Sequence, residues 1–371
     1  MALTEIYVDP AIAANSGTGT SGDPYGDLQY ALNTATRDST NGNRFNIKAG
    51  TAEILAAALV LTTYGTPTMA APLVIQGYTS TAGDGGIGQI DGNATYGMIA
   101  SQPGHVHWID LKLFNAGANR VVDVGAGALF LNCEVTGNSG AAKHGINMSS
   151  GAVIHCRVHT LSSQYIGIGA GSGNVLVDNC VIEGSFSSGG VQIGTSNVHV
   201  RNTIFNISSG GYGVYVSTSN FISIANCSFR SSSGTGAAIY VNAAGSNAIQ
   251  DIRNNIITGW SGAGGKGIRS LTAAQILLYG ANAFYNNTTD EENIDAVCSL
   301  PNIALTNTPF TDAAGGDFSI ATAAKAELQA QGWPSDFNGI NTSQFLDPGA
   351  AQIEIDVSTG AHRIFGGLIV G

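Results

Sequence analysis

The side chains that could carry hydrolytic chemistry in this sequence are a few carboxylates in its central region. The candidates are Glu134, Asp178, Glu183 and Asp251. Inverting glycoside hydrolases hold two carboxylates roughly 6.5–9.5 Å apart, on either side of the bond to be cut. Here Glu134 precedes Arg157 by 23 residues, and Asp178 precedes Arg201 by 23 residues. This shared spacing favours exposed ion pairs between equivalent positions of a repeat, so we predict no catalytic residue.

Two histidines are considered as possible metal ligands. His105 and His107 are alternate residues, which would lie on one face of a strand. The next outward histidine of the same sheet, His199, lies four repeats on, roughly 19 Å away at the usual strand spacing. The sequence has no CxxC or HExxH motif. We therefore predict no metal ion and no other cofactor.

Turns that contain Asn recur through the chain at nearly constant spacing. They form a column at Asp110, Asn132, His155, Asn179, Asn202, Asn226, Asn254 and Asn282, with intervals of 22, 23, 24, 23, 24, 28 and 28 residues. The following positions form a second column of Leu111, Cys133, Cys156, Cys180, Thr203, Cys227, Asn255 and Ala283. Periods of roughly 20–50 residues indicate a solenoid, whose units bury their apolar faces against one another.

Within each repeat the apolar residues alternate, as in NVLVDN (174–179) and NVHVRN (197–202). Alternation punctuated by Gly and Ser, without a helical period, predicts strands. Such short repeats without helices predict an all-β, single-stranded, right-handed parallel β-helix. The inward residues would be Trp108, Phe130, Val153, Val177, Val200, Ile224 and Ile252.

The two columns are interpreted as structural ladders. An Asn amide at a bend can hydrogen-bond to the Asn above and below it, which satisfies polar groups of the corner. The predicted ladder residues are Asn132, Asn179, Asn202, Asn226 and Asn254, with Cys133, Cys156, Cys180 and Cys227 stacked beside them. Side chains in register point the same way, which disfavours disulfide geometry, so we expect free, non-catalytic thiols.

Another outward stripe offers candidates for ligand binding. It holds Asp123, Asn147, Gln192, Tyr215, Tyr240 and Arg269, and the ligand-binding candidates are Gln192, Tyr215, Tyr240 and Arg269. Tyr beside amide and charged groups is typical of a carbohydrate- or protein-binding surface, and it is equally acceptable on a solvated sheet face. On a further sheet, outward Val181, Ile204 and Ile256 suggest burial against a partner subunit.

We divide the chain into three parts. Residues 1–44 form a strand (5–9), a loop and a capping helix, residues 45–285 form the coils, and residues 286–371 form a C-terminal cap or attachment segment. The capping helix is expected from Asp27, its N-cap, to Thr36, with Leu28, Ala31 and Leu32 inward. The last part predicts a helix near 321–331, a strand at 352–358 and an apolar end that docks on a neighbour or sister subunit.

Composition narrows the classes of partner. Gly accounts for 51 of 371 residues and charged residues for only 11%, as in turn-rich all-β proteins. The net charge of −11 argues against nucleic acid, and against polyanionic glycans unless a cation mediates. The start shows no signal peptide, and no apolar run is long enough for a membrane span, so we expect a protein made in the cytoplasm without membrane contact.

Two stretches carry a resemblance to known proteins. IYVDP…GTGTSGDPYGDLQYAL (6–32) resembles the opening of pectate-lyase-like right-handed β-helix proteins. NAFYNNTTDEEN…LTNTPFTDAAGGDFSI (282–320) is similar to the closing segment of a set found in bacteriophage and environmental bacterial genomes. VHWIDLKL (106–113) is similar to the WIDH signature of the lyases, but Leu111 replaces its His and no RxPxxR supplies a catalytic Arg.

This resemblance favours a non-enzymatic structural protein of a bacteriophage virion. It would be a head decoration (cement) protein or a spike, a homotrimer located on the virion and bound to other capsid or tail proteins. Two alternatives stay open. One is a polysaccharide lyase or glycoside hydrolase of the tailspike depolymerase type, and the other is an adhesin whose Tyr-bearing face binds a host-surface polysaccharide.

Overall fold

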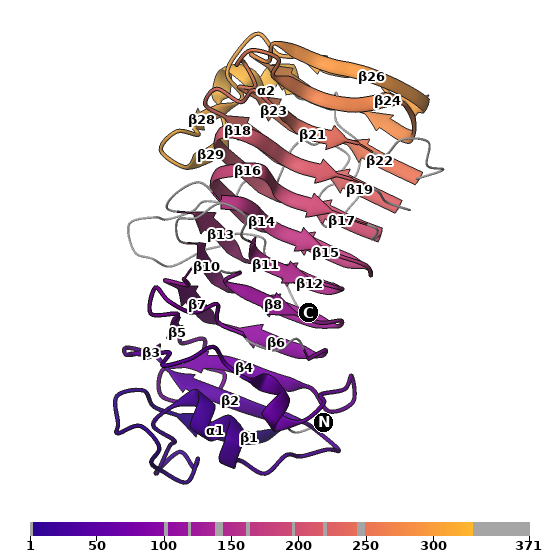
Figure 1. Cartoon of the computed structure of the whole chain (residues 1–371). Helices are drawn as coiled ribbons and strands as arrows, with labels where there is room; N and C mark the ends of the chain where they lie inside the picture. The colour runs from indigo at the N-terminus through magenta and orange to yellow at the C-terminus, as the bar shows by residue number, and fades with distance from the viewer. Residues whose placement is uncertain are drawn as a thin grey trace, which may run out of the picture. The chain divides into compact units, whose positions relative to one another are not determined.

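The structure, a computed structural model, describes residues 3–99, 103–117, 120–137, 144–160, 164–194, 197–217, 221–242 and 249–328. The chain divides into two compact units, Met1–Leu176 and Val177–Gly371. Each unit is a stack of coils whose strands run parallel to one another (Figure 1). The predicted fold class, an all-β parallel β-helix, is therefore confirmed. None of the helices in the described part of the chain is long and apolar enough to cross a membrane.

The first unit contains three rows of parallel strands, and each strand pairs with its counterpart one coil away. Row one comprises β1 (Thr4–Val8), β2 (Asn43–Lys48), β4 (Leu73–Tyr78), β6 (Val106–Ile109), β9 (Ala128–Leu131) and β12 (Gly151–Ile154). Row two comprises β3 (Ala52–Ile54), β5 (Gly88–Asp91), β7 (Leu111–Phe114), β10 (Glu134–Gly137) and β13 (Arg157–Thr160). Row three comprises β8 (Val122–Val124), β11 (His144–Met148) and β14 (Gln164–Ala170).

The second unit repeats this arrangement with longer strands. Its row one contains β17 (Asn197–Arg201), β19 (Phe221–Ala225), β22 (Ile249–Arg253) and the end of β24 (Lys266–Gly280). β16 (Val181–Ile193) and β18 (Ile204–Val216) each run through rows two and three. Row two continues with β20 (Ser228–Ser231), β23 (Ile256–Thr258), β25 (Ala283–Tyr285) and β27 (Ile303–Ala304), and row three with β21 (Ala237–Val241), the start of β24 and β26 (Thr289–Ser299). The remaining strand, β15 (Val175–Asp178), begins in one unit and ends in the other.

The core of each unit is a set of columns of stacked side chains. The seven predicted inward residues, from Trp108 to Ile252, are all 0% exposed. Because parallel strands in register place like positions above one another, aromatic residues stack as well. The rings of Trp108 and Phe130 lie 6.1 Å apart in the first unit, and those of Phe205 and Phe229 lie 4.5 Å apart in the second.

The Asn column marks a backbone conformation that most residues avoid. Its members from Asp110 to Asn254 have φ between 53° and 56°, in the left-handed region, and they separate row one from row two. Asn and Asp are enriched there because their short side chains reduce the strain. In the last coil this place is taken by Ala281 (φ 50°), so the assignment of Asn282 to the column is wrong. The final repeat is one residue shorter than predicted, and Asn282 stands beside Asn255 in the second column.

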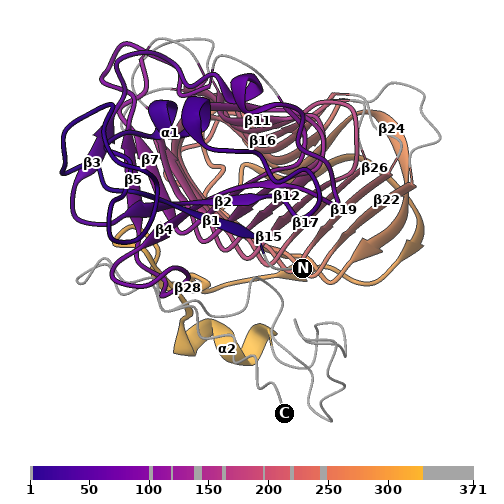
Figure 2. The same ribbon diagram turned by 90° about the horizontal axis from the view of Figure 1, so that it is seen from below.

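The N-terminal end of the first unit carries the predicted capping helix, α1 (Leu28–Thr34), as Figure 2 shows. Asp27 is its N-cap and accepts a hydrogen bond from the backbone N–H of Tyr30 at 2.6 Å. Leu28, Ala31 and Leu32 are buried, as the apolar stripe predicted. A 3-10 helix, η1 (Leu61–Tyr64), lies beside α1.

The buried carboxyl group of Glu53 is expected to make the stability of this unit depend on pH. Its side chain is buried and accepts the backbone N–H of Leu28 at 3.2 Å. Burial, reinforced by the Asp27 carboxylate, raises the pKa of Glu53 from 4.5 to about 7. Since the folded state binds this proton more tightly than the unfolded state, stability falls as pH rises from 4.5 to 7, by up to about 3 kcal/mol.

Glu53→Gln keeps the acceptor for Leu28 and removes the charge. We expect the free energy of unfolding of this variant to be nearly independent of pH over this interval and to exceed that of the wild type at pH 8. Urea denaturation at pH 5 and pH 8 measures the effect, and Glu5→Gln, an exposed carboxylate of the same unit, is the matched control. If the free energy of unfolding depended on pH equally in the wild type and in Glu53→Gln, the raised pKa of Glu53 would be contradicted.

The C-terminal segment of the second unit covers one outer face of the coils. The hairpin of β28 (Phe310–Asp312) and β29 (Asp317–Ile320), followed by α2 (Thr322–Leu328), lies outside the coils in Figure 2. Its apolar residues pack with those of row two in one buried cluster: Val181, Ile204, Ile256, Ala283, Ile303, Leu305, Phe310, Phe318, Ala324 and Leu328. Burial of Val181, Ile204 and Ile256 by a partner subunit is therefore wrong, because the chain itself covers them. The predicted strand at 352–358 and the apolar end lie outside the described residues.

Candidate functional site

The four predicted ligand-binding residues lie in one outward column of row three in the second unit. In register, Gln192 of β16 neighbours Tyr215 of β18, which neighbours Tyr240 of β21. Tyr240 in turn neighbours Arg269 of β24, and Arg269 neighbours Glu292 of β26. One repeat position therefore brings together residues separated by 100 positions in the sequence, from Gln192 to Glu292.

Three tyrosine rings contact one another on this face, and we call Tyr212, Tyr215 and Tyr240 the tyrosine surface. The ring centroids of Tyr212 and Tyr240 lie 4.8 Å apart, those of Tyr212 and Tyr215 5.3 Å, and those of Tyr215 and Tyr240 5.5 Å. Burial, followed by the neighbouring Tyr240, raises the pKa of Tyr212. The Tyr212 phenol therefore stays neutral near pH 7.

Sequence reasoning missed Tyr212 because strict alternation would turn it inward. The backbone is irregular here, since a Cβ added to Gly213 would lie 2.7 Å from the Phe229 ring, and Val214 is fully buried. Two successive residues thus face the core, which leaves Tyr212 and Tyr215 on the same outer face. A Gly between apolar strand residues is the one signal that could have indicated this irregularity.

Polar groups surround the tyrosine surface. The Asn242 amide donates to the Tyr215 hydroxyl at 2.9 Å, and the Ser188 hydroxyl donates to Gln192 at 3.2 Å. The Arg269 guanidinium lies over the Tyr240 ring, 5.2 Å from its centroid. Ring faces edged by amides and hydroxyls match the alternating apolar and hydroxyl surfaces of a sugar.

The charges beside the tyrosine surface are paired. Arg269 Nε lies 3.2 Å from Glu292 Oε2, and Lys266 Nζ lies 3.8 Å from the same oxygen. Arg269 thus has a charge partner as well as the Tyr240 ring. The surface presents aromatic and neutral hydrogen-bonding groups more than unpaired charge.

The outward stripe of the first unit has a different composition. Asn147 donates to Asp123 at 2.7 Å, and its carbonyl oxygen contacts the Nδ1 of His144 at 3.0 Å. Arg120 pairs with the other carboxylate oxygen of Asp123. Burial lowers the pKa of His144, so this imidazole is neutral near pH 7. The result is a hydrogen-bonded chain without an aromatic platform.

The residues that resemble the lyase signature have structural roles. Trp108 is fully buried against Phe130. Asp110 adopts a left-handed φ of 53° and accepts hydrogen bonds from Gln76 at 3.1 Å and Asn132 at 2.7 Å. Leu111, at the place of the lyase His, is buried in row two. Both carboxylate oxygens of Asp110 are thus occupied by neighbouring coils.

One of the two predicted ion pairs is present as expected, and the carboxylate of the other has further partners. Asp178 pairs with Arg201 at 2.8 Å, as the spacing indicated. Glu134 neighbours Arg157 in register, and its carboxylate also contacts His159 at 3.1 Å and Lys112 at 3.4 Å. These contacts, the His159 hydrogen bond first, lower the pKa of Glu134 to about 2.

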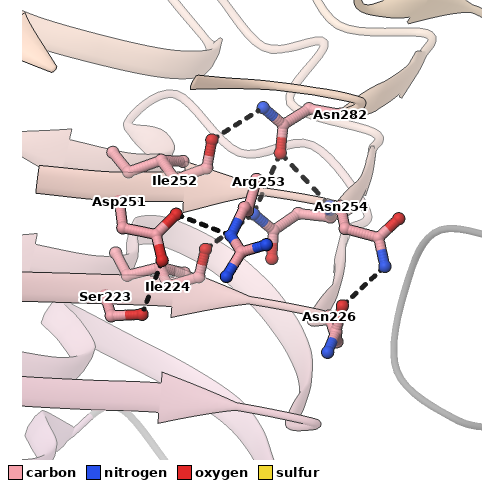
Figure 3. Close-up of polar contacts among 9 residues, drawn as sticks. Ser223, Ile224, Asn226, Asp251, Ile252, Arg253, Asn254 and Asn282 are labelled. Atoms are coloured by element: carbon pink, nitrogen blue, oxygen red, sulfur yellow. Dashed lines mark hydrogen bonds and ion pairs between the residues drawn. The ribbon is translucent and has the colours of Figure 1, made fainter. Parts of the chain in front are cut away.

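The fourth carboxylate candidate, Asp251, accepts hydrogen bonds from Arg253 at 2.8 Å and Ser223 at 3.2 Å (Figure 3). The two histidines considered as a metal pair are His105 and His107. Burial, and then the charge of His105, lower the pKa of His107. Within the described ranges, no group of three or more His, Cys, Asp or Glu side chains is arranged to hold a metal ion.

Side-chain hydrogen bonds connect the predicted ladder residues to neighbouring coils. The amides of Asn132 and Asn202 donate to the carboxylates Asp110 and Asp178, so those two steps are not Asn-to-Asn. Asn254 donates to Asn226, as Figure 3 shows. Asn179 is buried and left-handed at the same bend.

In the second column Cys133, Cys156, Cys180 and Cys227 are buried, free thiols. The backbone N–H of Cys133 donates to the Cys156 sulfur at 3.4 Å, and that of Cys180 donates to the Thr203 hydroxyl, also at 3.4 Å. Complete burial raises the pKa of Cys227 well above its usual range. The Cys227 thiol is therefore protonated and unreactive at neutral pH.

These features define a parallel β-helix with an outward aromatic and polar surface, and known proteins share that fold. A family described as "Right handed beta helix region" matches residues 96–251. The crystal structure of pectate lyase Pel9A is similar over 94% of this chain and 97% of that one, with a TM-score of 0.60 and 12% sequence identity. No curated protein matches the sequence significantly. At this identity the likeness shows the right-handed parallel β-helix fold alone.

Proposed function

We propose that this protein is a non-enzymatic structural β-helix that binds a glycan on its tyrosine surface. The observation that carries the proposal is the contact among Tyr212, Tyr215 and Tyr240, whose ring centroids are 4.8–5.5 Å apart. Tyr212 and Tyr215 are partly exposed, so their rings offer a sugar an apolar contact, and the Asn242 and Gln192 amides lie beside them to bind hydroxyl groups.

A neutral glycan suits this surface better than a polyanion. Arg269 and Lys266 share the single carboxylate of Glu292, so no more than one net positive charge is left there to bind carboxylates. The net charge of −11 further opposes a long polyanion at low ionic strength. We therefore expect binding that changes little with salt concentration.

The test is a glycan array of bacterial polysaccharides, followed by titration of the strongest binder. Tyr240→Ala is expected to weaken binding about tenfold or more, because it removes the buried ring against which Tyr212 and Tyr215 pack. Tyr240→Phe keeps the ring and should stay close to wild type, and Tyr96→Ala, in the first unit, is the matched control. Binding that is unaffected by Tyr240→Ala would refute the tyrosine surface as the site.

We further propose that the protein is part of a bacteriophage particle, as a homotrimeric head decoration or spike that contacts other capsid or tail proteins. The support is the sequence resemblance of residues 282–320 to the closing segment of β-helices found in bacteriophage and environmental bacterial genomes. The face at Val181, Ile204 and Ile256 no longer supports a trimer, because the chain itself covers it. Mass spectrometry of purified particles and light scattering of the pure protein test location and subunit number.

The second candidate function is a polysaccharide lyase or glycoside hydrolase, and the fold shared with pectate lyase Pel9A favours it. Its test is incubation with the polysaccharides that bind, followed by absorbance of unsaturated uronates and by reducing ends. A rise in either signal that grows with protein concentration would replace the non-enzymatic proposal. Stable binding without either product supports it.

A further inference from the structure

Two interior columns of the second unit change from aliphatic to polar in the last coils. One column runs from Val214 through Ile239 and Ile268 to Glu291. The other runs from Ile224 through Ile252 to Tyr279 and Ser299. Glu291 and Ser299 are exposed at the end of the stack, whereas Tyr279 remains buried, so the two columns end in a polar rim beside a buried phenol.

These polar side chains line a cleft of about 500 Å³. The hydroxyl of Tyr279, a residue only 3% exposed, donates to Glu291 Oε1, and the Asn302 amide donates to the same oxygen at 2.9 Å. Asn293 adds another amide, and Ile294 and Leu300 add apolar walls. Burial, then the charge of Glu291 and the hydrogen bond to it, raise the pKa of Tyr279, which keeps its hydroxyl a donor.

We propose that this cleft binds a single sugar-sized polyhydroxylated ligand, with an amino sugar preferred over a neutral sugar and an acidic sugar excluded. The volume lies within the range of small-molecule sites, roughly 300–1,000 Å³. Two donors hold one oxygen of Glu291, and its other oxygen remains an acceptor for a ligand hydroxyl or ammonium group.

The charge around the cleft supports the order of preference. Glu291 is the one acidic side chain among the residues that line the cleft, and Asp290 precedes it on the same strand. The nearby cations Lys266 and Arg269 contact Glu292. A ligand carboxylate would therefore meet repulsion, whereas an ammonium group would be attracted.

This site is separate from the tyrosine surface. Glu291 follows Ile268 in an inward column, whereas Glu292 follows Arg269 in the outward column. The proposal therefore does not rest on glycan binding at the tyrosine surface. A polar end that merely faces water would show no selectivity among sugars of equal size.

Ligand-detected NMR titrations with glucosamine, methyl glucoside and glucuronate test the cleft in the full-length protein. We expect glucosamine to bind about fivefold more tightly than methyl glucoside, and glucuronate not to bind measurably. Glu291→Gln should remove the preference for glucosamine. Ala296→Trp, which fills the cleft without removing a polar group, should weaken both ligands about tenfold or more.

Asp295→Asn removes a charge from the same strand outside the cleft lining and is the matched control, with binding expected as in wild type. Circular dichroism confirms that each variant is folded. The proposal is overturned if none of the three sugars binds, if Glu291→Gln keeps the preference for glucosamine, or if Ala296→Trp binds like wild type.

Discussion

Replacing Phe229 with Ala is expected to lower the free energy of unfolding by about 3–5 kcal/mol, because it opens a large cavity in a packed core. Phe229 is fully buried and stacks on Phe205 at 4.5 Å, with their ring planes 8° apart. In register it also neighbours Ile257 of the next coil. The removed ring therefore leaves contacts unfilled both above and below.

Urea denaturation of Phe229→Ala measures this loss, and Phe221→Ala is the matched control. Phe221 lies on β19 of the same unit, half-buried on the outer face, so its removal should cost less than about 1.5 kcal/mol. Gly213, which follows Tyr212, packs against the Phe229 ring. Loss of this ring should therefore also disturb Tyr212 and weaken glycan binding by the tyrosine surface in Phe229→Ala. Equal losses of stability in the two variants would contradict the stacked interior column.

A charge at Phe318 is expected to detach the C-terminal segment from the coils. Phe318 is 5% exposed, its ring lies 5.0 Å from that of Phe310, and both belong to the cluster over Val181, Ile204 and Ile256. Phe318→Asp loses the buried ring and buries an unpaired carboxylate, at a cost of at least about 3 kcal/mol. This would raise the population of the detached state about 100-fold.

Limited proteolysis reports this detachment as faster cleavage within residues 305–328. Phe318→Leu, which keeps an apolar side chain, is the control and should be cleaved only modestly faster than wild type. If Phe318→Asp were cleaved at the wild-type rate, the segment would not cover this face. Loss of an oligomer at an unchanged cleavage rate would instead indicate a partner subunit there.

The repeat made the fold predictable because a solenoid applies the same rule in every coil. Alternation within each repeat identified the inward residues from Trp108 to Ile252, and all are fully buried. The reason given for Asn at the bends was incomplete, because the left-handed φ of residues such as Asn202 is a backbone requirement. Amide ladders and left-handed turns favour the same residue type, so a single sequence does not separate them.

The parts of the structure that could not be predicted depend on contacts that do not recur from one coil to the next. Tyr212 joins Tyr215 only because the backbone is irregular at Gly213. The outward apolar residues Ile204 and Ile256 indicated a covering element correctly, but nothing in their spacing identified residues 305–328 as that element. At the last bend Ala281 takes the place of Asn, and the adjacent Asn282 was therefore assigned to the column in its stead.

A crystal structure of the protein with the oligosaccharide that binds best on the array tests the central claim most directly. We expect sugar rings against Tyr212 and Tyr215, with hydroxyl groups bonded to Asn242 or Gln192 and the glycosidic bonds intact. An oligosaccharide bound on another face, or one found cleaved, would contradict it.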